Sequence, residues 1–245
     1  MLKGKKALIT GGATGIGRAV ALTLARNGAD VAINYSRSEK EALEIVEEIK
    51  ALGANGLLCP GDVADDGQVR SMVKKITEIF QGLDFLINSA GTTVFVDDTD
   101  LDGLLDEHWD RIMAVNVKGT FHCCRAASSQ LKKSRGCIVN ISSIAGLTGL
   151  GSSIAYAASK AAVISLTKSL GRSMAPHVRV NSVAPGIVRT RWVEGQDAHI
   201  KRLAAGTPMG RVATPEDVAE VVFSLIAHAR FVTGQTIVVD GGVYC

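Results

Sequence analysis

Seven short apolar runs recur along this chain of 245 residues, and segments with the apolar spacing of helices separate them. The runs occupy residues 6–10, 30–34, 55–59, 84–88, 137–142, 178–183 and 235–239. Each run has the length of a strand, and within it apolar residues follow one another rather than alternating with polar ones. Such strands are buried on both faces, as in a parallel sheet that helices cover on two sides. The pattern therefore predicts an α/β protein with a doubly wound Rossmann fold and a seven-stranded parallel sheet.

The composition fits one domain over residues 1–245, since 47% of the residues are hydrophobic and 21% are charged, enough to bury one full core. The formal net charge is only +3, without a block of Lys and Arg or a stripe of aromatic and basic residues. We therefore expect no nucleic-acid partner. No run approaches the roughly 18 apolar residues of a membrane span, and the run after the basic start is too short for a signal peptide. We expect a cytoplasmic protein without a membrane partner.

The cysteines and histidines are not spaced as metal ligands. The five cysteines contain no C-x-x-C pair, and the five histidines are scattered without H-E-x-x-H spacing. The G-x-S-x-G elbow of serine hydrolases is also missing. We therefore expect reduced, mostly buried thiols and no metal ion.

Tyr156 and Lys160 are four residues apart in a segment with helical spacing, so they lie on the same face of one helix. A free tyrosine has a pKa of about 10, and a fixed positive charge nearby favours the phenolate. Lys160 is thus expected to draw the pKa of Tyr156 toward neutral, where an acid or base works best. Ser143 lies on the loop between the run at 137–142 and this helix, where it can bond the oxygen that Tyr156 protonates or deprotonates.

A glycine-rich loop, T-G-G-A-T-G-I-G at residues 10–17, joins the first strand to the first helix. Glycines let the backbone turn tightly and approach a pyrophosphate, whose charge is met by the exposed amides at the start of the helix. Taken alone, such a loop is also compatible with a plain turn. The candidate cofactor contacts in it are Gly11, Thr14, Gly15, Ile16 and Gly17.

In combination, these residues resemble the short-chain dehydrogenase/reductase family. The family has a T-G-x-x-x-G-x-G loop, a serine, a Y-x-x-x-K motif and an upstream asparagine, which is Asn116 in this chain. The resemblance covers nearly the whole chain and implies reversible hydride transfer between a nicotinamide and a ketone or secondary alcohol. It implies that Tyr156 is the acid/base, that Ser143 donates to the substrate oxygen, and that Lys160 tunes Tyr156 and binds the ribose. It further implies that Asn116 holds a water linking Lys160 to solvent.

The segment after the second strand bears on the choice of cofactor. NAD sites place an acid about 20 residues beyond the glycines, whereas NADP sites place a basic residue there for the 2′-phosphate. This region holds Arg37 and no acid before Glu39. We therefore predict NADP(H), with Tyr35, Ser36 and Arg37 at the phosphate, while NAD(H) stays open if Arg37 is only a solvated residue. Ser38 and an acid three residues later predict a capping box for the next helix.

Other cofactor contacts follow from the family resemblance alone. Asp62 and Val63 stand where relatives contact the adenine ring, although an aspartate before a helix is also an ordinary N-cap. The N-S-A-G sequence after the fourth strand replaces the family's usual N-N-A-G, with Ser89 as the departure. The Pro-Gly turn after the sixth strand and the threonine beyond it are expected to face the nicotinamide. These candidates are Asn88, Ala90, Gly91, Pro185, Gly186, Val188 and Thr190.

The sequence constrains the substrate and the partners less strongly. Residues 97–110 hold seven acids without Lys or Arg, which does not favour acyl carrier protein, an acidic partner. Lys132 and Lys133 favour it, so this partner stays open. Residues 187–211 contain three glycines and a proline and predict a substrate lid, the alternative being an ordinary surface excursion.

Three functions compete on this pattern. The first is an NADP-linked reductase of a ketone-bearing small molecule, closest in pattern to the 3-oxoacyl carrier-protein reductases. The alternative is an NAD(P)-dependent dehydrogenase of sugars or cyclic alcohols. The remote alternative is a non-catalytic NADP-binding sensor or scaffold, which has no need of Tyr156. The resemblance also implies a homotetramer, with the turn at 240–242 packed at a subunit interface.

Overall fold

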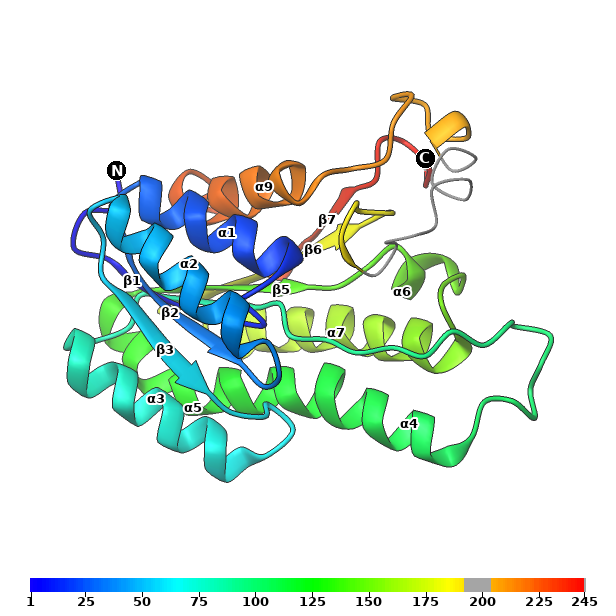
Figure 1. The fold of residues 1–245 in the computed structure, drawn as a ribbon, viewed down its shortest axis with the longest axis horizontal. Coiled ribbons are helices and arrows are strands. Elements are labelled where there is room, and N and C mark those ends of the chain that lie inside the picture. Colours follow the sequence, from blue (N-terminus) through cyan, green and yellow to red (C-terminus); the bar gives the residue numbers. More distant parts are fainter. Residues whose placement is uncertain (192–203, 245) are drawn as a thin grey trace.

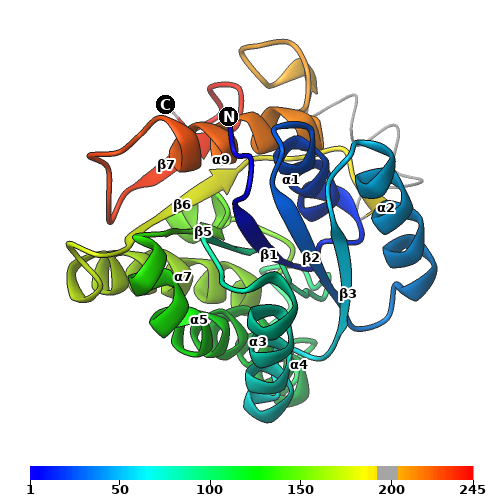
Figure 2. The ribbon, with the colours of Figure 1, turned by 90° about the vertical axis from the view of Figure 1, so that its left-hand side faces the viewer.

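The computed structural model describes residues 1–191 and 204–244. Its centre is one seven-stranded sheet in which all neighbouring strands are parallel (Figures 1 and 2). The strands are β1 Lys6–Thr10, β2 Asp30–Tyr35, β3 Gly56–Pro60, β4 Phe85–Asn88, β5 Cys137–Ile141, β6 Arg179–Pro185 and β7 Thr236–Val239. Their order, β3-β2-β1-β4-β5-β6-β7, confirms the predicted doubly wound Rossmann sheet.

Helices cover both faces of the sheet (Figure 2). The helices are α1 Gly15–Arg26, α2 Glu39–Ala51, α3 Asp66–Phe80, α4 Asp106–Ile112, the π-helical turn η1 Met113–Gly119, α5 Thr120–Ser134, α6 Ala145–Thr148, α7 Ile154–Ser173 and α9 Pro215–Ala227. Buried residues of α1, α2 and α9 pack on one face, and those of α3 and α5 pack on the other. Among the helices of the described residues, none is long and apolar enough to cross a membrane.

The continuous apolar strands fill two cores at once. Ile9 of β1 belongs to the core under α1 and α9, whereas its neighbour Leu8 belongs to the core under α3 and α5. Ile87 and Leu86 of β4 divide in the same way, and all four side chains have no exposed surface. Burying a side chain of this size contributes about 1.5–3 kcal/mol. Both faces of the strands therefore demand apolar residues, which explains why the sequence shows no alternation.

The sheet reverses its direction of growth between β1 and β4. From β1 the chain builds toward β3 on one side, and from β4 it builds toward β7 on the other. In such sheets a crevice opens beyond the carboxyl ends of the strands at this switch point. The hydroxyl oxygen of Thr10, at the end of β1, accepts hydrogen bonds from the backbone amides of Ser89 and Ala90, each at 3.1 Å. The glycine loop and the loop after β4 therefore start from the same place.

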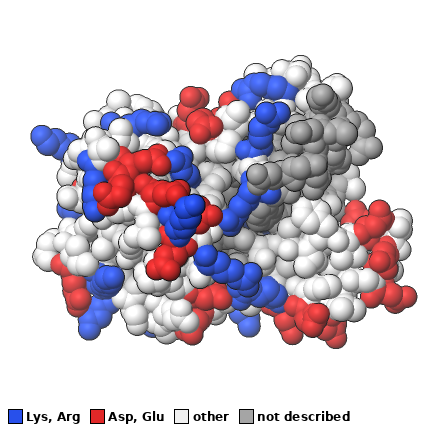
Figure 3. Space-filling view, viewed as in Figure 1, with Lys and Arg blue, Asp and Glu red and all other residues white. Residues whose placement is uncertain are grey.

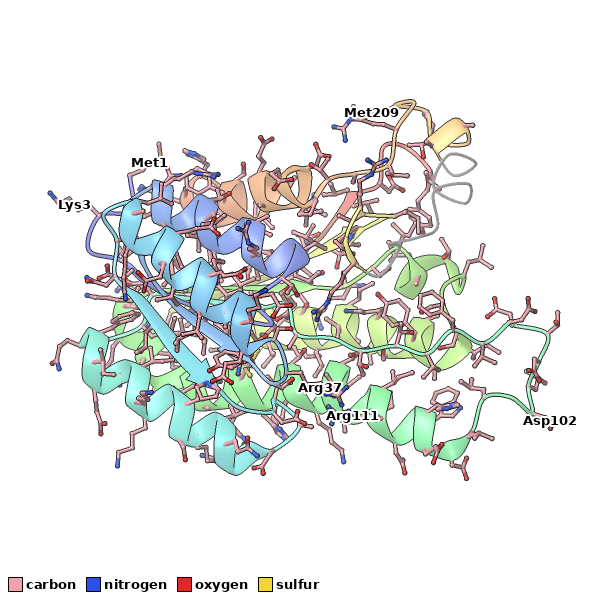
Figure 4. All side chains as sticks on the ribbon, in the orientation of Figure 1. Met1, Lys3, Arg37, Asp102, Arg111 and Met209 are labelled. Carbon is pink, nitrogen blue, oxygen red and sulfur yellow. The ribbon has the colours of Figure 1, made fainter. Side chains whose placement is uncertain are left out.

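Three helical segments, α4, η1 and α5, follow one another without a break and run alongside α7 (Figure 1). The loop between β4 and α4 extends beyond the body of the molecule, and Figure 3 shows acidic side chains gathered at this end. Asp102 lies at its tip (Figure 4). The acidic segment is thus an exposed extension next to the carboxyl ends of the strands.

Some local expectations are corrected by the structure. The predicted capping box at the start of α2 is wrong, because the Ser38 side chain makes no capping hydrogen bond. Asp62 is not the N-cap of α3; that position is held by Asp65, whose carboxylate accepts from the backbone amide of Gln68 at 3.0 Å. Cys59 and the three other described cysteines are free and buried, as expected.

Candidate active site

A cavity of about 1170 Å³ opens at the carboxyl ends of the strands. Its walls come from the loops after β1, β2, β3, β4, β5 and β6, together with the first turns of α7. Three of the four predicted catalytic residues line it: Ser143, Tyr156 and Lys160. The predicted cofactor contacts that line it are Gly11, Thr14, Gly15, Ile16, Tyr35, Ser36, Arg37, Asp62, Val63, Ala90, Gly91, Tyr156, Lys160, Pro185, Gly186, Val188 and Thr190. Gly17, Asn88 and Asn116 lie outside this wall.

The glycine loop leaves no room for a side chain at Gly11 or Gly17. Gly11 has φ +60°, and a Cβ there would lie 2.9 Å from the Cα of Ala90. A Cβ at Gly17 would lie 2.3 Å from the carbonyl oxygen of Gly11. Gly17 therefore allows α1 to pack closely against its own loop, and Gly11 allows the loop to pass the chain after β4. The backbone of the loop is left facing the cavity.

Tyr156 and Ser143 meet at the cavity from opposite sides. Tyr156 is in the first turn of α7, whose N-cap hydroxyl on Ser153 accepts a hydrogen bond from the Tyr156 backbone amide at 3.3 Å. Ser143 follows β5 by two residues, and its hydroxyl also accepts from the Ala145 amide at 3.1 Å. Burial raises the pKa of Tyr156 to about 12, and a hydrogen bond with Ser143 acts in the opposite direction.

Lys160 is one turn further along α7 and is almost wholly buried. Its ammonium donates to the carbonyl oxygen of Ile141 at 2.9 Å and lies 5.5 Å from the centroid of the Tyr156 ring. Burial lowers the pKa of Lys160 to about 8. The expectation that Lys160 brings the pKa of Tyr156 toward neutral is therefore not met in this structure, because burial dominates for both groups.

Asn116 lies behind the cavity wall, in the π-helical turn η1. Its side-chain amide donates to the carbonyl oxygen of Thr92 at 3.0 Å and to the hydroxyl of Ser159 at 2.9 Å. Its side-chain oxygen accepts from the Thr92 amide at 2.8 Å. Asn116 thus fastens the loop after β4 to α7, a contact that its sequence position did not reveal.

Asn88 is likewise an internal support. Its side-chain amide donates to the side-chain oxygen of Asn140 at 2.8 Å and to the sulfur of Cys124 at 3.3 Å. These contacts join β4 to β5 and α5 below the cavity. Asn88 therefore supports the central sheet from inside, and it is not among the residues that line the cavity.

The far end of the cavity, around the loop after β2, carries three arginines. Arg37 comes from that loop, Arg111 from α4 and Arg191 from the chain after β6. Arg111 bonds the Asp62 carboxylate at 3.0 Å. Burial acts to raise the pKa of Asp62, but bonds from the Ala64 amide and Arg111 hold it below its usual value. Sequence reasoning missed Arg111 and Arg191, because neither stands at a motif position.

The other end of the cavity is apolar. Phe95 and Leu150 line it and are 67% and 70% exposed, and Ile187 is 39% exposed. The hydroxyl groups of Thr93 and Ser152 also line it and are hydrogen-bonded to each other at 2.5 Å. These side chains lie on the Tyr156 side and form the wall that a substrate would meet.

The predicted lid at 187–211 is described only in part, since residues 192–203 lie outside the described residues. Before this gap, the backbone amide of Arg189 donates to the carbonyl oxygen of Ala213 at 2.9 Å. After it, the amide of Met209 donates to the carbonyl oxygen of Gly241 at 3.2 Å. The two ends of the segment are therefore fixed near β6 and β7. Among the described residues, no group of three or more His, Cys, Asp or Glu is placed to hold a metal ion.

Comparison with known proteins gives one consistent result. The family model described as Enoyl-(Acyl carrier protein) reductase matches residues 11–244. The 3-oxoacyl-[acyl-carrier-protein] reductase FabG of Staphylococcus aureus is 39% identical over 244 residues, covering 98% of both chains. The L-rhamnose 1-dehydrogenase (NAD(P)(+)) of a Sphingomonas species is 38% identical and covers 100% of this chain and 98% of its own.

Solved structures agree with this result. A short chain dehydrogenase from Burkholderia cenocepacia in complex with NADP matches with a TM-score of 0.91 and 35% identity, covering 100% of this chain and 99% of its own. A short-chain type dehydrogenase/reductase from Mycobacterium marinum has the same TM-score of 0.91 and identity of 35%, and covers 100% of this chain and 97% of its own. This chain therefore belongs to the short-chain dehydrogenase/reductase family and is an NAD(P)-dependent oxidoreductase.

Proposed function

We propose that the protein is an NADP(H)-dependent reductase of ketones carrying an apolar substituent, with 3-oxoacyl thioesters as the first substrate class to test. The observation that carries the proposal is the meeting of Ser143 and Tyr156 in the same cavity as the glycine loop and Arg37. A FabG relative and a relative bound to NADP support it.

The described residues fit a nicotinamide dinucleotide. The loop at Gly11 and Gly15 has no side chains that would block a pyrophosphate, and both residues have positive φ. Asp62 and Val63 would hold the adenine, and Lys160 and Tyr156 would hold the ribose next to the nicotinamide; all four line the cavity. Ser36 and Arg37 would hold the 2′-phosphate, and the residues that would face the nicotinamide are Pro185, Gly186, Val188 and Thr190, all of which line the cavity. When bound, this cofactor supplies the hydride.

Protonation of the substrate oxygen falls to Tyr156. With a pKa of about 12, its phenol is protonated at neutral pH and can donate to a carbonyl oxygen as the carbonyl carbon gains a hydride. Ser143 bonds Tyr156 and is placed to donate to the same substrate oxygen. The charge of Lys160 stabilises the phenolate that remains. We propose that Asn116 holds, at one of its oxygens, a water that returns a proton through Lys160, since both hydrogens of its side-chain amide are already donated.

The apolar wall favours an alkyl or aryl ketone over a sugar. Phe95, Leu150 and Ile187 offer contact area to an apolar chain, and the hydroxyl groups of Thr93 and Ser152 at this end are already hydrogen-bonded to each other. The acidic extension at residues 97–110 does not favour a substrate attached to acyl carrier protein, because that protein is itself acidic. The rhamnose dehydrogenase relative keeps a sugar or cyclic-alcohol dehydrogenase as the second candidate.

We further propose one domain over residues 1–245, a cytoplasmic location and assembly as a homotetramer. Exposed apolar side chains near the C-terminal strand support assembly, since Phe231 is 104% exposed and Val243 is 52% exposed. We expect these side chains to be covered at subunit contacts. Sedimentation velocity should give the mass of four chains and not one.

The proposed function is tested by titrating the purified protein with NADPH and NADH and then measuring turnover of three substrate sets. These sets are β-ketoesters, cyclic ketones, and sugars in the oxidative direction. Tighter NADPH binding with β-ketoester turnover supports the proposal. Tighter NADH binding, or turnover confined to sugars or cyclic alcohols, would establish the second candidate instead.

A further inference from the structure

A hydrogen bond crosses the mouth of the cavity between two segments that are distant in the sequence. A guanidinium nitrogen of Arg191 donates to the hydroxyl of Ser38 at 3.0 Å, and both residues line the cavity. Ser38 follows β2, whereas Arg191 follows β6. These strands lie on opposite sides of the switch between β1 and β4. Arg191 therefore reaches from the nicotinamide side of the cavity to the side expected to hold the adenosine.

The contact also explains why the Ser38 side chain does not cap α2. Ser38 occupies the N-cap position of that helix, yet its side chain makes no capping bond. Its hydroxyl instead accepts from Arg191. The tertiary contact thus replaces the local one, and it places the Arg191 guanidinium against the residue that follows Arg37 in the sequence.

The arginines that line the cavity differ in whether a carboxylate pairs with them. Arg111 is paired with Asp62 at 3.0 Å. In the part of the chain that the structure describes, no carboxylate lies within the 4.0 Å limit of an ion pair from Arg37 or Arg191. Figure 3 shows basic side chains gathered near the middle of the front face, and Figure 4 labels Arg37 and Arg111 there. Among the described residues, two guanidinium groups without a carboxylate in ion-pair contact thus stand at the same end of the cavity, on different elements.

We propose that Arg191 is a second arm of the 2′-phosphate site, leaving the Ser38 hydroxyl to bind the phosphate that Arg37 holds from the other side. A phosphate monoester carries close to two negative charges at neutral pH, which matches two cations. A guanidinium also binds phosphate oxygens with two parallel N–H groups, which an ammonium cannot do. Arg191 is then a specificity-determining residue for the cofactor. The inference rests on the proposed NADP(H) function.

The test measures the dissociation constants of NADPH and NADH for the full chain and for single variants. Arg191→Ala should weaken NADPH binding about tenfold, equivalent to about 1.4 kcal/mol, and change NADH binding less than about twofold. Arg191→Lys should retain part of the NADPH affinity, because it keeps the charge and loses the two-point contact. Arg189→Ala is the matched control. It removes the same charge two residues earlier in the chain, and the Arg189 side chain lies outside the cavity wall.

The outcomes separate this inference from the proposed function. If Arg191→Ala weakens NADPH and NADH equally, Arg191 serves the pyrophosphate or the loop, and the inference is wrong. If it behaves like Arg189→Ala, the inference is also wrong. Arg37→Ala tests the proposed function itself: a selective loss of NADPH affinity keeps NADP(H) as the cofactor even where Arg191 fails. If Arg37→Ala leaves the ratio of NADPH to NADH affinity unchanged, both the inference about Arg191 and the proposed NADP(H) function are wrong.

Discussion

The ammonium of Lys160 is hydrogen-bonded to the main-chain carbonyl oxygen of Ile141, at 2.9 Å. Ile141 is the last residue of β5, and Ser143 follows it by two positions. Lys160 therefore ties α7 to the chain segment that carries Ser143, besides bringing a positive charge within 5.5 Å of the Tyr156 ring centroid. Its burial makes this charge costly, since the pKa of Lys160 falls to about 8.

The buried charge predicts a pH-dependent stability difference between the wild type and Lys160→Met. The pKa of Lys160 falls from 10.5 in the unfolded chain to about 8 in the folded one, so the unfolded chain binds more protons between these values. The free energy of unfolding of the wild type, relative to Lys160→Met, should therefore rise by roughly 2 kcal/mol between pH 8 and pH 10. Urea unfolding of both proteins checks this, and a difference that is constant with pH would contradict it.

Tyr156→Phe is expected to lower the turnover number by at least about 100-fold, because the phenol that donates the proton is lost. NADPH binding should change by no more than about threefold, since the ring and its surroundings remain. Steady-state kinetics and a fluorescence titration give the two values. Tyr244→Phe, on an exposed tyrosine at the C-terminal end, is the matched control. Unchanged turnover in Tyr156→Phe would contradict the assignment of Tyr156 as the group that donates the proton.

The raised pKa of Tyr156 predicts different pH profiles for the two directions of the reaction. Below a pKa of about 12 the phenol stays protonated, so kcat/KM for ketone reduction should not rise between pH 6 and pH 8. Alcohol oxidation needs the phenolate, whose fraction rises about tenfold for each pH unit below the pKa. Its kcat/KM should therefore rise over the same range. A reduction rate that rises with pH would contradict the assignment of Tyr156 as the proton donor.

The parts of the site that the sequence predicts are those set by local spacing. The Tyr156 and Lys160 pair lies on one face of α7 because four residues make about one helical turn, and the glycine loop follows β1 as the pattern required. The parts it does not predict are tertiary. Ser38 was expected to cap α2 and instead binds a residue 153 positions away, and the three side-chain hydrogen bonds of Asn116 join separate elements.

The pKa expectation failed for a related reason. Sequence spacing shows that Lys160 is near Tyr156, but it does not show how deeply either is buried. The structure shows that burial raises the pKa of Tyr156 and lowers the pKa of Lys160. Burial depends on the whole fold, including α6 and the end of β5, and no local motif encodes it.

Gly146 is expected to position Ser143, although it stands in no motif. A Cβ at Gly146 would lie 2.5 Å from the carbonyl carbon of Lys160 and 2.6 Å from the nitrogen of Ala161, which are backbone atoms that cannot turn away. Gly146→Ala should therefore push α6 from α7, lower turnover at least about tenfold and lower the melting temperature by several degrees. Gly67→Ala is the control, because the nearest atom to its Cβ would be a side-chain oxygen, that of the N-cap residue Asp65 at 3.2 Å, and not a backbone atom of another helix. Equal effects of both substitutions would contradict this role.

Phe95 is expected to bind the apolar part of the substrate. It lines the cavity with 67% of its surface exposed, so a substrate chain can cover it. If roughly 60 Å² of the ring is covered, the contact contributes about 1.5 kcal/mol, which is about tenfold in kcat/KM. Phe95→Ser should then lower kcat/KM by this factor for β-ketoesters with long alkyl chains and leave the methyl homologue within about twofold.

The chain-length dependence separates this contact from a change in the loop. A disturbed loop would lower kcat/KM for every ketone alike, because the residues around Tyr156 would move; the amide of Val96, next in the chain, is bonded to the carbonyl oxygen of Ser152 at 3.0 Å. Leu43→Ser, on the exposed part of α2 away from the cavity, controls for the loss of an apolar surface residue. If Phe95→Ser lowers kcat/KM for every ketone alike, or if Leu43→Ser lowers it equally, Phe95 does not bind the substrate chain. The argument for apolar ketones over sugars would then be weaker.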